Sequence, residues 1–151
     1  MDNVDEALVR KVADELEIRN LIARLAQVAD NASIDEVDQY VELFTEDATW
    51  AVLSDQFLPA QERRGHDELR AAARKRREDG VQGPGTNRRH VISTHSIVFE
   101  TPDRALSHCY WQNITETLSE AQVIAGIGQY FDTVVRTPDG WRLHRREIRA
   151  G

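Results

Sequence analysis

Cysteine is almost absent from this chain of 151 residues, in which Cys109 is the only one. A single thiol excludes a disulfide framework within the chain and a zinc site built from several cysteines. Such sparse cysteine is typical of proteins that work in a reducing compartment, so we expect the protein to be cytoplasmic.

Long apolar runs are also lacking, and none approaches the roughly 20 residues that a membrane span requires. Residues 1–14 are charged and contain no apolar stretch typical of a secretory signal. Basic residues are in the minority, because 19 Lys and Arg face 26 Asp and Glu, a net charge of −7. We therefore expect neither a membrane nor a nucleic acid as a partner.

The chain does have the composition of a folded protein, with 40% hydrophobic and 30% charged residues. These proportions supply a core and a solvated surface, which excludes a disordered chain. There is no internal repeat and no linker of low complexity. The length fits one domain over residues 1–151.

Three helices are expected in the first half of the chain. Apolar residues recur at helical spacing over residues 5–29, which predicts one long helix. Ser33 and Glu36 have the S-x-x-E spacing of a capping box, so we expect a second helix over residues 34–44. Residues 66–78, rich in Ala and Arg, predict the third.

Strands dominate the rest of the sequence. Residues 48–53 are aromatic and β-branched and open an early hairpin. Four further strands, separated by turn signals, are predicted over residues 90–100, 105–118, 121–136 and 141–148. Helices followed by meandering strands indicate an α+β fold, with the helices on one face of a mostly antiparallel sheet.

Six segments in order resemble SnoaL-like proteins of the NTF2-like superfamily. They are residues 22–30 (IARLAQVAD), 43–50 (LFTEDATW), 64–69 (RGHDEL), 89–93 (RHVIS), 128–132 (GQYFD) and 139–143 (DGWRL). The resemblance implies a cone-shaped fold in which a curved sheet and three helices enclose a deep pocket. The superfamily includes scytalone dehydratase, a dehydrochlorinase and polyketide cyclases. It also implies a homodimer or homotrimer formed through the exposed sheet face.

Asp30 is the first candidate catalytic residue. It ends the long predicted helix, where a carboxylate meets an unfavourable helix dipole, so a purely structural role is unusual. The alternative is a turn residue that binds the backbone of residues 31–33. In the dehydratase and dehydrochlorinase relatives an Asp here orients a catalytic histidine, and the resemblance implies that role for Asp30.

His90 is the second candidate, and the resemblance identifies it as the catalytic histidine. Imidazole suits proton abstraction because it exchanges protons near neutral pH. The alternative is a surface histidine beside Arg88 and Arg89. His95 competes with it, but their odd separation places them on opposite faces of a strand unless a bulge intervenes. That parity also argues against a zinc site from His90, His95 and His108, so no metal is expected.

Aromatic residues are expected around the substrate, although core packing is the main alternative for most of them. The predicted substrate contacts are Phe44, Trp50, Tyr110 and Tyr130, with Trp50 preferred, and Trp111 is a further pocket or core aromatic. Scytalone dehydratase has a tyrosine just before its Asp, where this chain has Ala29. Tyr40 and Tyr110 are the residues that could replace its water-polarising tyrosines.

Arginines provide the remaining candidates. Among the relatives an Arg on the last strand assists substrate binding, which leaves Arg145 or Arg146, and we favour Arg146. A basic cluster in the third predicted helix comprises Arg70, Arg74, Lys75, Arg76 and Arg77. It is interpreted as a solvated helix face, with anion binding as the alternative.

The sequence therefore predicts an enzyme, a lyase or isomerase that needs no cofactor. His90 removes a proton from a small apolar cyclic substrate, and Asp30 holds the imidazole. Two alternatives stay open. One is a non-catalytic small-molecule-binding or assembly module with the same fold, and the other is a polyketide-type cyclase that uses Asp30 alone.

Overall fold

The computed structural model describes residues 3–53 and 59–151 of the chain. Within them, three α-helices accompany one six-stranded sheet. The helices are α1 (Asn3–Asn31), α2 (Asp38–Val41) and α3 (Gly65–Glu78), and a short 3-10 helix, η1 (Ile34–Glu36), precedes α2. The strands are β1 (Phe44–Val52), β2 (Gln61–Arg64), β3 (Arg89–Thr101), β4 (Arg104–Thr115), β5 (Val123–Thr137) and β6 (Gly140–Ala150).

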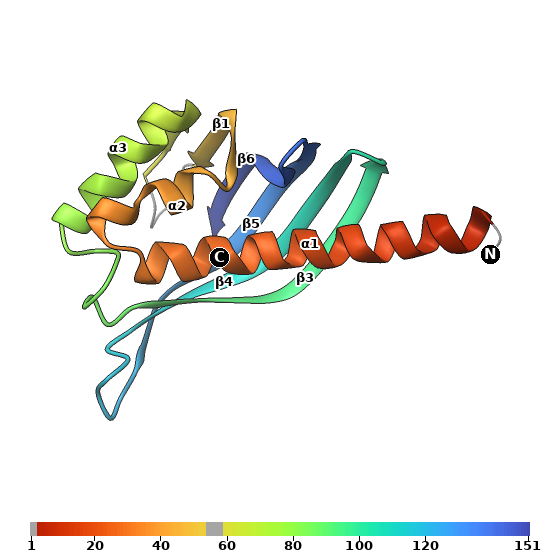
Figure 1. Cartoon of the computed structure of the whole chain (residues 1–151). Coiled ribbons are helices and arrows are strands. Elements are labelled where there is room, and N and C mark those ends of the chain that lie inside the picture. The colour runs from red at the N-terminus through yellow and green to blue at the C-terminus, as the bar shows by residue number, and fades with distance from the viewer. Residues whose placement is uncertain (1–2, 54–58) are drawn as a thin grey trace.

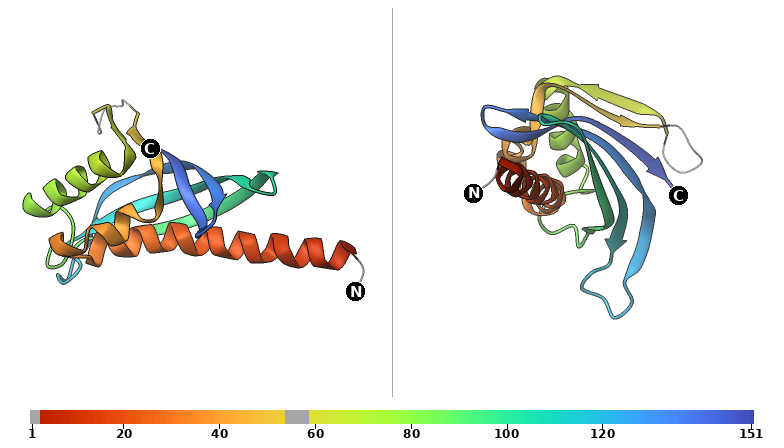
Figure 2. Two further views of the ribbon diagram at one scale, coloured as in Figure 1. Left: turned by 45° about the horizontal axis from the view of Figure 1, so that its top comes forward. Right: turned by 90° about the vertical axis from the view of Figure 1, so that its right-hand side faces the viewer.

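The sheet is curved and mostly antiparallel, as predicted. Its strand order is β2-β1-β6-β5-β4-β3, and β1 with β6 is the one parallel pair among these neighbours. Figures 1 and 2 show α1 running along the concave side of the sheet, with α3 beside β1 at one end. The α+β prediction, with helices gathered on one side of the sheet, is confirmed.

Helix α1 is longer than the sheet that it crosses. Its second half buries Ile18, Ile22 and Leu25, each 1% exposed or less, against the sheet. Its first half projects beyond the sheet (Figure 1), and Leu8 and Val9 remain exposed there. The helix therefore brings its C-terminal end, rather than its N-terminal end, to the centre of the fold.

The second predicted helix is corrected by the structure. Residues 34–44 form only η1 and α2, and Phe44 is already the first residue of β1. The capping interaction is present, since the Ser33 N–H donates to Glu36 Oε2 at 2.9 Å. The helix ends early because Phe44 pairs with Leu143 of β6, and this tertiary pairing outweighs the local helical pattern.

The four C-terminal strands are found where the sequence predicted them, with one irregularity that matters for the site. The register between β3 and β4 shifts between Ser93 and Ser96, and Thr94 has a positive φ of 50°. This bulge moves one residue out of the alternation. His90 and His95 consequently face the same, inner side of the sheet despite their odd separation.

Buried polar contacts tie α1 to the end of the sheet. The Trp141 ring is 1% exposed, and its Nε1–H donates to Asp14 Oδ1 at 3.1 Å. Asp14 also pairs with Arg136 at 2.6 Å.

Burial raises the pKa of the Cys109 thiol to about 12, which makes it an unreactive core residue.

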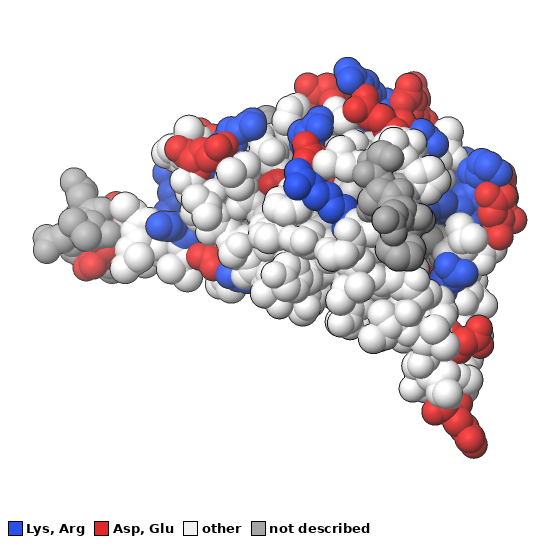
Figure 3. Space-filling view, turned by 180° about the vertical axis from the view of Figure 1, so that it is seen from behind, with Lys and Arg blue, Asp and Glu red and all other residues white. Residues whose placement is uncertain are grey.

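The outer, convex face of the sheet carries exposed apolar side chains. Val98, Leu106 and Ile127 are between 41% and 61% exposed. Figure 3 shows the molecule from behind, where uncharged residues cover most of the central surface.

None of the helices in the described ranges has the length and apolar character needed to cross a bilayer.

Candidate functional site

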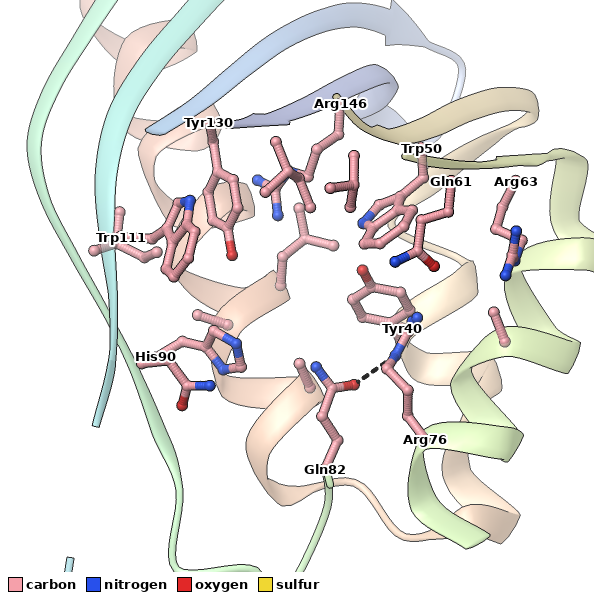
Figure 4. Close-up of a pocket in the computed structure, with 18 of the residues that line it drawn as sticks. Tyr40, Trp50, Gln61, Arg63, Arg76, Gln82, His90, Trp111, Tyr130 and Arg146 are labelled. Carbon is pink, nitrogen blue, oxygen red and sulfur yellow. Dashed lines mark hydrogen bonds between the residues drawn. The ribbon is translucent and has the colours of Figure 1, made fainter. Parts of the chain in front are cut away.

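A cavity of about 390 Å³ lies between the concave face of the sheet, α1 and α3. Its size falls within the usual range of small-molecule sites. Apolar side chains from α1 and the sheet form much of the wall, namely Ile22, Leu25, Ala29, Ile92 and Ile148. Four aromatic residues, Tyr40, Trp50, Trp111 and Tyr130, complete it (Figure 4).

Asp30 and His90 meet at the edge of this cavity, although 60 positions separate them in the sequence. His90 Nδ1 lies 2.6 Å from Asp30 Oδ1, and the backbone N–H of His90 donates to Asp30 Oδ2 at 2.8 Å. Both carboxylate oxygens are thus engaged by one residue. This double contact fixes the imidazole relative to the end of α1.

The contact between His90 and Asp30 determines which nitrogen of the His90 ring faces away from the carboxylate. A carboxylate can only accept, so Nδ1 carries a hydrogen, and in the neutral ring Nε2 is then the nitrogen with the free lone pair. His90 lines the cavity, whereas Asp30 is 4% exposed and is not part of the cavity wall. Nε2 is therefore the atom of this pair that a bound molecule can reach.

Arg77 of α3 holds the end of α1 in place behind this pair. Its guanidinium donates to the carbonyl oxygens of Ala32 at 2.8 Å and Val28 at 3.2 Å. The Val28 carbonyl also accepts the backbone N–H of Ala32 at 3.0 Å, so Arg77 adds a second, charged donor to the last turn of α1. The positive charge also offsets the negative helix end beside Asp30.

Arg146, rather than Arg145, points into the fold, as predicted. Arg146 lines the cavity and makes a bidentate ion pair with Asp132, at 2.8 and 2.7 Å. Its guanidinium stacks on the Tyr130 ring, 3.9 Å from the centroid. Burial disfavours its charged form, but Asp132 outweighs that cost and holds the Arg146 pKa above its ordinary value. Arg145 instead pairs with Glu147 on the other side.

Two of the four predicted aromatic contacts line the cavity and two do not. Trp50 and Tyr130 are in its wall, as is Tyr40. Phe44 is 2% exposed and packs on Tyr40 in the core, so its prediction as a substrate contact is corrected. Tyr110 is 41% exposed on the outer face of β4, and placing it in the pocket was wrong.

His95 faces inward but lies apart from the cavity wall. Its Nε2 is 2.8 Å from Ser107 Oγ, and Arg19 donates to its backbone carbonyl at 3.0 Å. Burial, and then the charges of Arg19 and Arg146, hold the pKa of His95 below its usual value. His95 is thus a neutral, internally bonded residue. His108 lies on the outer face, stacked on Phe131.

The sequence analysis missed a polar side of the cavity. Gln61 and Arg63 reach it from β2, and Lys75, Arg76, Asp79 and Gln82 reach it from α3 and the following loop. A signal was present, because Ala72, Lys75, Arg76 and Asp79 have the i, i+3, i+4, i+7 spacing of one helix face. The basic cluster does not act as one surface, since Arg77 caps α1 and Arg74 is exposed.

Two buried polar atoms of β4 beside the cavity have no hydrogen-bond partner among the described residues. They are Trp111 Nε1 and Asn113 Oδ1. Asn113 stands directly opposite His90 in the β3–β4 register. Buried groups left unpaired in this way are uncommon in proteins and often mark functional sites.

Over residues 3–53 and 59–151, no cluster of three His, Cys, Asp or Glu side chains is positioned to hold a metal ion.

Residues 10–147 match the family model described as a SnoaL-like domain. No curated protein sequence matches the chain significantly. Among solved structures, an NTF2-like protein with a cystatin-like fold from Novosphingobium aromaticivorans is similar, with 25% sequence identity and a TM-score of 0.73. The similarity covers 99% of this chain and 90% of that one.

Two further structures share the fold. A candidate scytalone dehydratase from Novosphingobium aromaticivorans is 22% identical, with a TM-score of 0.71 over 95% of this chain and 88% of that one. ActVI-ORFA from Streptomyces coelicolor is 18% identical, with a TM-score of 0.66 over 90% and 96% of the two chains. At these identities the similarities establish the architecture and leave the chemistry to the site itself.

Proposed function

The chain belongs to the SnoaL-like family, and from this premise we propose that it is a lyase or isomerase that works without a cofactor. His90 Nε2 removes a proton from a small, largely apolar cyclic substrate held in the cavity. The observation that carries the proposal is the 2.6 Å contact between His90 Nδ1 and Asp30 Oδ1 at the cavity wall.

The proposed step needs only a base and a place for the electron pair. The substrate C–H bond breaks as His90 Nε2 takes the proton, and a double bond forms. In elimination the electron pair expels halide, or it expels a hydroxyl group that leaves as water after taking the proton back from the His90 imidazolium. In isomerisation the electron pair moves and the imidazolium returns the proton to a second carbon. Asp30 is a positioning residue, since it holds the ring and stabilises the imidazolium that forms.

The surroundings of the pair favour this chemistry. Leu25 and Ala29 of α1 and Ile92 of β3 line the cavity around His90, and an apolar wall excludes water. In such a medium the attraction between imidazolium and carboxylate is stronger than in water. Arg146 is rigidly held by Asp132, which offsets most of its charge, so it contributes a fixed polar group to the same cavity.

The geometry disfavours a cyclase that uses Asp30 alone. Both Asp30 oxygens bind His90, and the Asp30 side chain is absent from the cavity wall. A substrate in the cavity therefore meets His90 first.

The proposal is tested by proton exchange with cyclic ketones such as 1-tetralone and 2-tetralone in D2O, followed by proton NMR. The wild type should exchange the protons next to the carbonyl faster than buffer does. His90→Ala should slow this exchange by about 10²–10⁴-fold, the usual contribution of a general base. Asp30→Asn should also slow it, because the ring loses its fixed orientation.

His108→Ala is the matched control, because it removes a histidine from the outer face of the sheet. It should leave exchange unchanged. Undiminished exchange in His90→Ala contradicts the proposal. Binding of the ketones without exchange above the buffer rate in the wild type also contradicts it, and favours the non-catalytic binding module.

A further inference from the structure

We propose that the natural substrate is an acid with a carboxylate on an apolar ring. Arg76 and Arg63 bind this carboxylate at the mouth of the cavity, the polar side that Gln61, Lys75 and Asp79 also line. The inference rests on the proposed function only in placing the ring near His90. The argument for the acid itself comes from the polar side of the cavity, which the proton-transfer step does not use.

The cavity has two chemically different sides. Figure 4 shows His90 and Trp111 on one side and Arg63, Gln61 and Arg76 toward the other. The His90 side is mainly apolar, whereas the opposite side opens to solvent, where Gln61 is exposed. A ligand that fills the cavity thus places one end among apolar groups and the other among cationic ones.

Arg76 is held in position to receive an anion. Its Nε donates to Gln82 Oε1 at 2.9 Å, and its guanidinium lies over the Trp50 ring, 5.4 Å from the centroid. Gln82 is a neutral acceptor, so this contact leaves the positive charge uncompensated. No carboxylate among the described residues pairs with Arg76, and its terminal nitrogens remain available for a bidentate contact.

Arg63 adds a second charge without a described carboxylate partner. It donates to the neighbouring carbonyl of Glu62, whereas the adjacent Arg64 makes an ion pair with the Glu62 side chain. Lys75 and Asp79 also line the mouth, but they pair with each other at 3.0 Å and largely cancel. Two positive charges, those of Arg63 and Arg76, therefore remain unpaired among the described residues at the mouth.

This surplus contrasts with the charge of the whole chain, which is −7. A local positive site within an acidic protein attracts an anion while most of the surface repels it, which concentrates the selectivity at the mouth. An apolar cyclic carboxylate matches both sides of the cavity, since its ring fits the apolar wall and its anionic group fits Arg76 and Arg63.

The test compares 2-naphthoate with 2-naphthamide, which has nearly the same shape but no charge, by isothermal titration calorimetry. The wild type should bind the acid at least about tenfold more tightly than the amide, as expected for a charge-assisted contact. Arg76→Gln should remove most of this preference. Raising the salt from about 0.05 M to about 0.5 M should also reduce it.

Arg74→Gln is the matched control, because it removes the same charge from an exposed position of the same helix. It should keep the preference, and so should His90→Ala, which separates acid binding from the proposed proton transfer. Equal affinity for the two probes in the wild type, no binding of the acid, or an equal effect of Arg74→Gln and Arg76→Gln would overturn the inference.

Discussion

Individual residues on β5 determine whether the aromatic wall of the cavity can form. The Trp111 ring lies over Gly126 and Gly128 of the neighbouring strand, where an added Cβ would collide with it at Gly128 and contact it tightly at Gly126. A Cβ at Gly128 would lie 2.6 Å from Trp111 Cζ2 and would also overlap the backbone carbonyl of Arg149. These glycines are needed for space rather than for an unusual backbone conformation.

Gly128→Ala should therefore destabilise the protein by about 2 kcal/mol or more, the usual cost of forcing an extra methyl group into a packed site. Chemical denaturation measures this directly. Gly126→Ala is the graded control, because its Cβ would approach Trp111 Cζ3 only to 3.1 Å. It should cost clearly less, and equal effects of the two substitutions would contradict this account of the packing.

At the same scale, the family resemblance narrowed the candidate arginines to Arg145 and Arg146, and the sequence misplaced an aromatic residue. Strand alternation puts the two arginines on opposite faces, but no signal in the sequence identifies which face is the inner one. The prediction for Tyr110 was wrong because both faces of β4 mix apolar and polar residues. Its buried residues include Ser107, and its outer residues include Leu106 and Tyr110. Where both faces carry mixed residues, alternation cannot tell inside from outside.

Among the elements, β3 shows how one bulge changes the chemistry of the site. The bulge at Thr94 brings His95 to the inner face, where it becomes a half-buried neutral histidine bonded to Ser107. A periodic pattern does not reveal such a bulge, because the extra residue is set by pairing with β4. The parity argument from the sequence was therefore valid only for a regular strand.

The burial of His95 predicts a pH dependence of stability. Its pKa is lowered in the folded protein, so the unfolded chain binds more protons as the pH falls below about 6.5. Protonation then favours unfolding, and stability should decrease from about pH 7 to about pH 5. His95→Gln should make this decrease smaller in denaturant titrations across that range. The same decrease in both proteins would argue against a half-buried neutral His95.

Helix α1 depends on α3 for its C-terminal cap. The guanidinium of Arg77 donates to carbonyls at the end of α1, next to Asp30. Arg77→Gln should lower the free energy of unfolding by about 1–2 kcal/mol, because these acceptors lose a charged donor. Arg74→Gln on the exposed side of α3 should change it by less than about 0.5 kcal/mol. Similar losses in both variants would show that overall helix charge, rather than the cap, is responsible.

For the whole molecule, the exposed apolar surface supports the expectation of a homodimer or homotrimer. Val98 and Leu106 are paired neighbours on the outer face of the sheet. We expect light scattering after gel filtration to give two or three times the chain mass of 17.2 kDa. Val98→Lys with Leu106→Lys should shift the mass toward the single chain, because buried lysines oppose association.

The control for that experiment is Leu118→Lys, at a position that is 84% exposed on the turn between β4 and β5. It should keep the oligomer. A wild-type protein that runs as a single chain at all concentrations would contradict the expectation.

The architecture as a whole was predictable because the periodic patterns are long and the turn signals are clear. The strands after residue 89 were found nearly at their predicted bounds, since the turn at Thr137–Gly140 is encoded locally. The predicted extent of the second helix was wrong because Phe44 pairs with a strand that begins almost 100 residues later. The cationic mouth was missed for a similar reason, since Arg63 and Arg76 line one cavity only after β2 and α3 are in place.

The measurement that tests the central claim most directly is the nitrogen-15 NMR spectrum of the His90 ring in the folded protein. The account predicts that the neutral ring carries its hydrogen on Nδ1, held by Asp30, rather than on Nε2, and that Asp30→Asn removes this preference. A ring protonated on Nε2 alone, or a mixture of tautomers unaffected by Asp30→Asn, would contradict it.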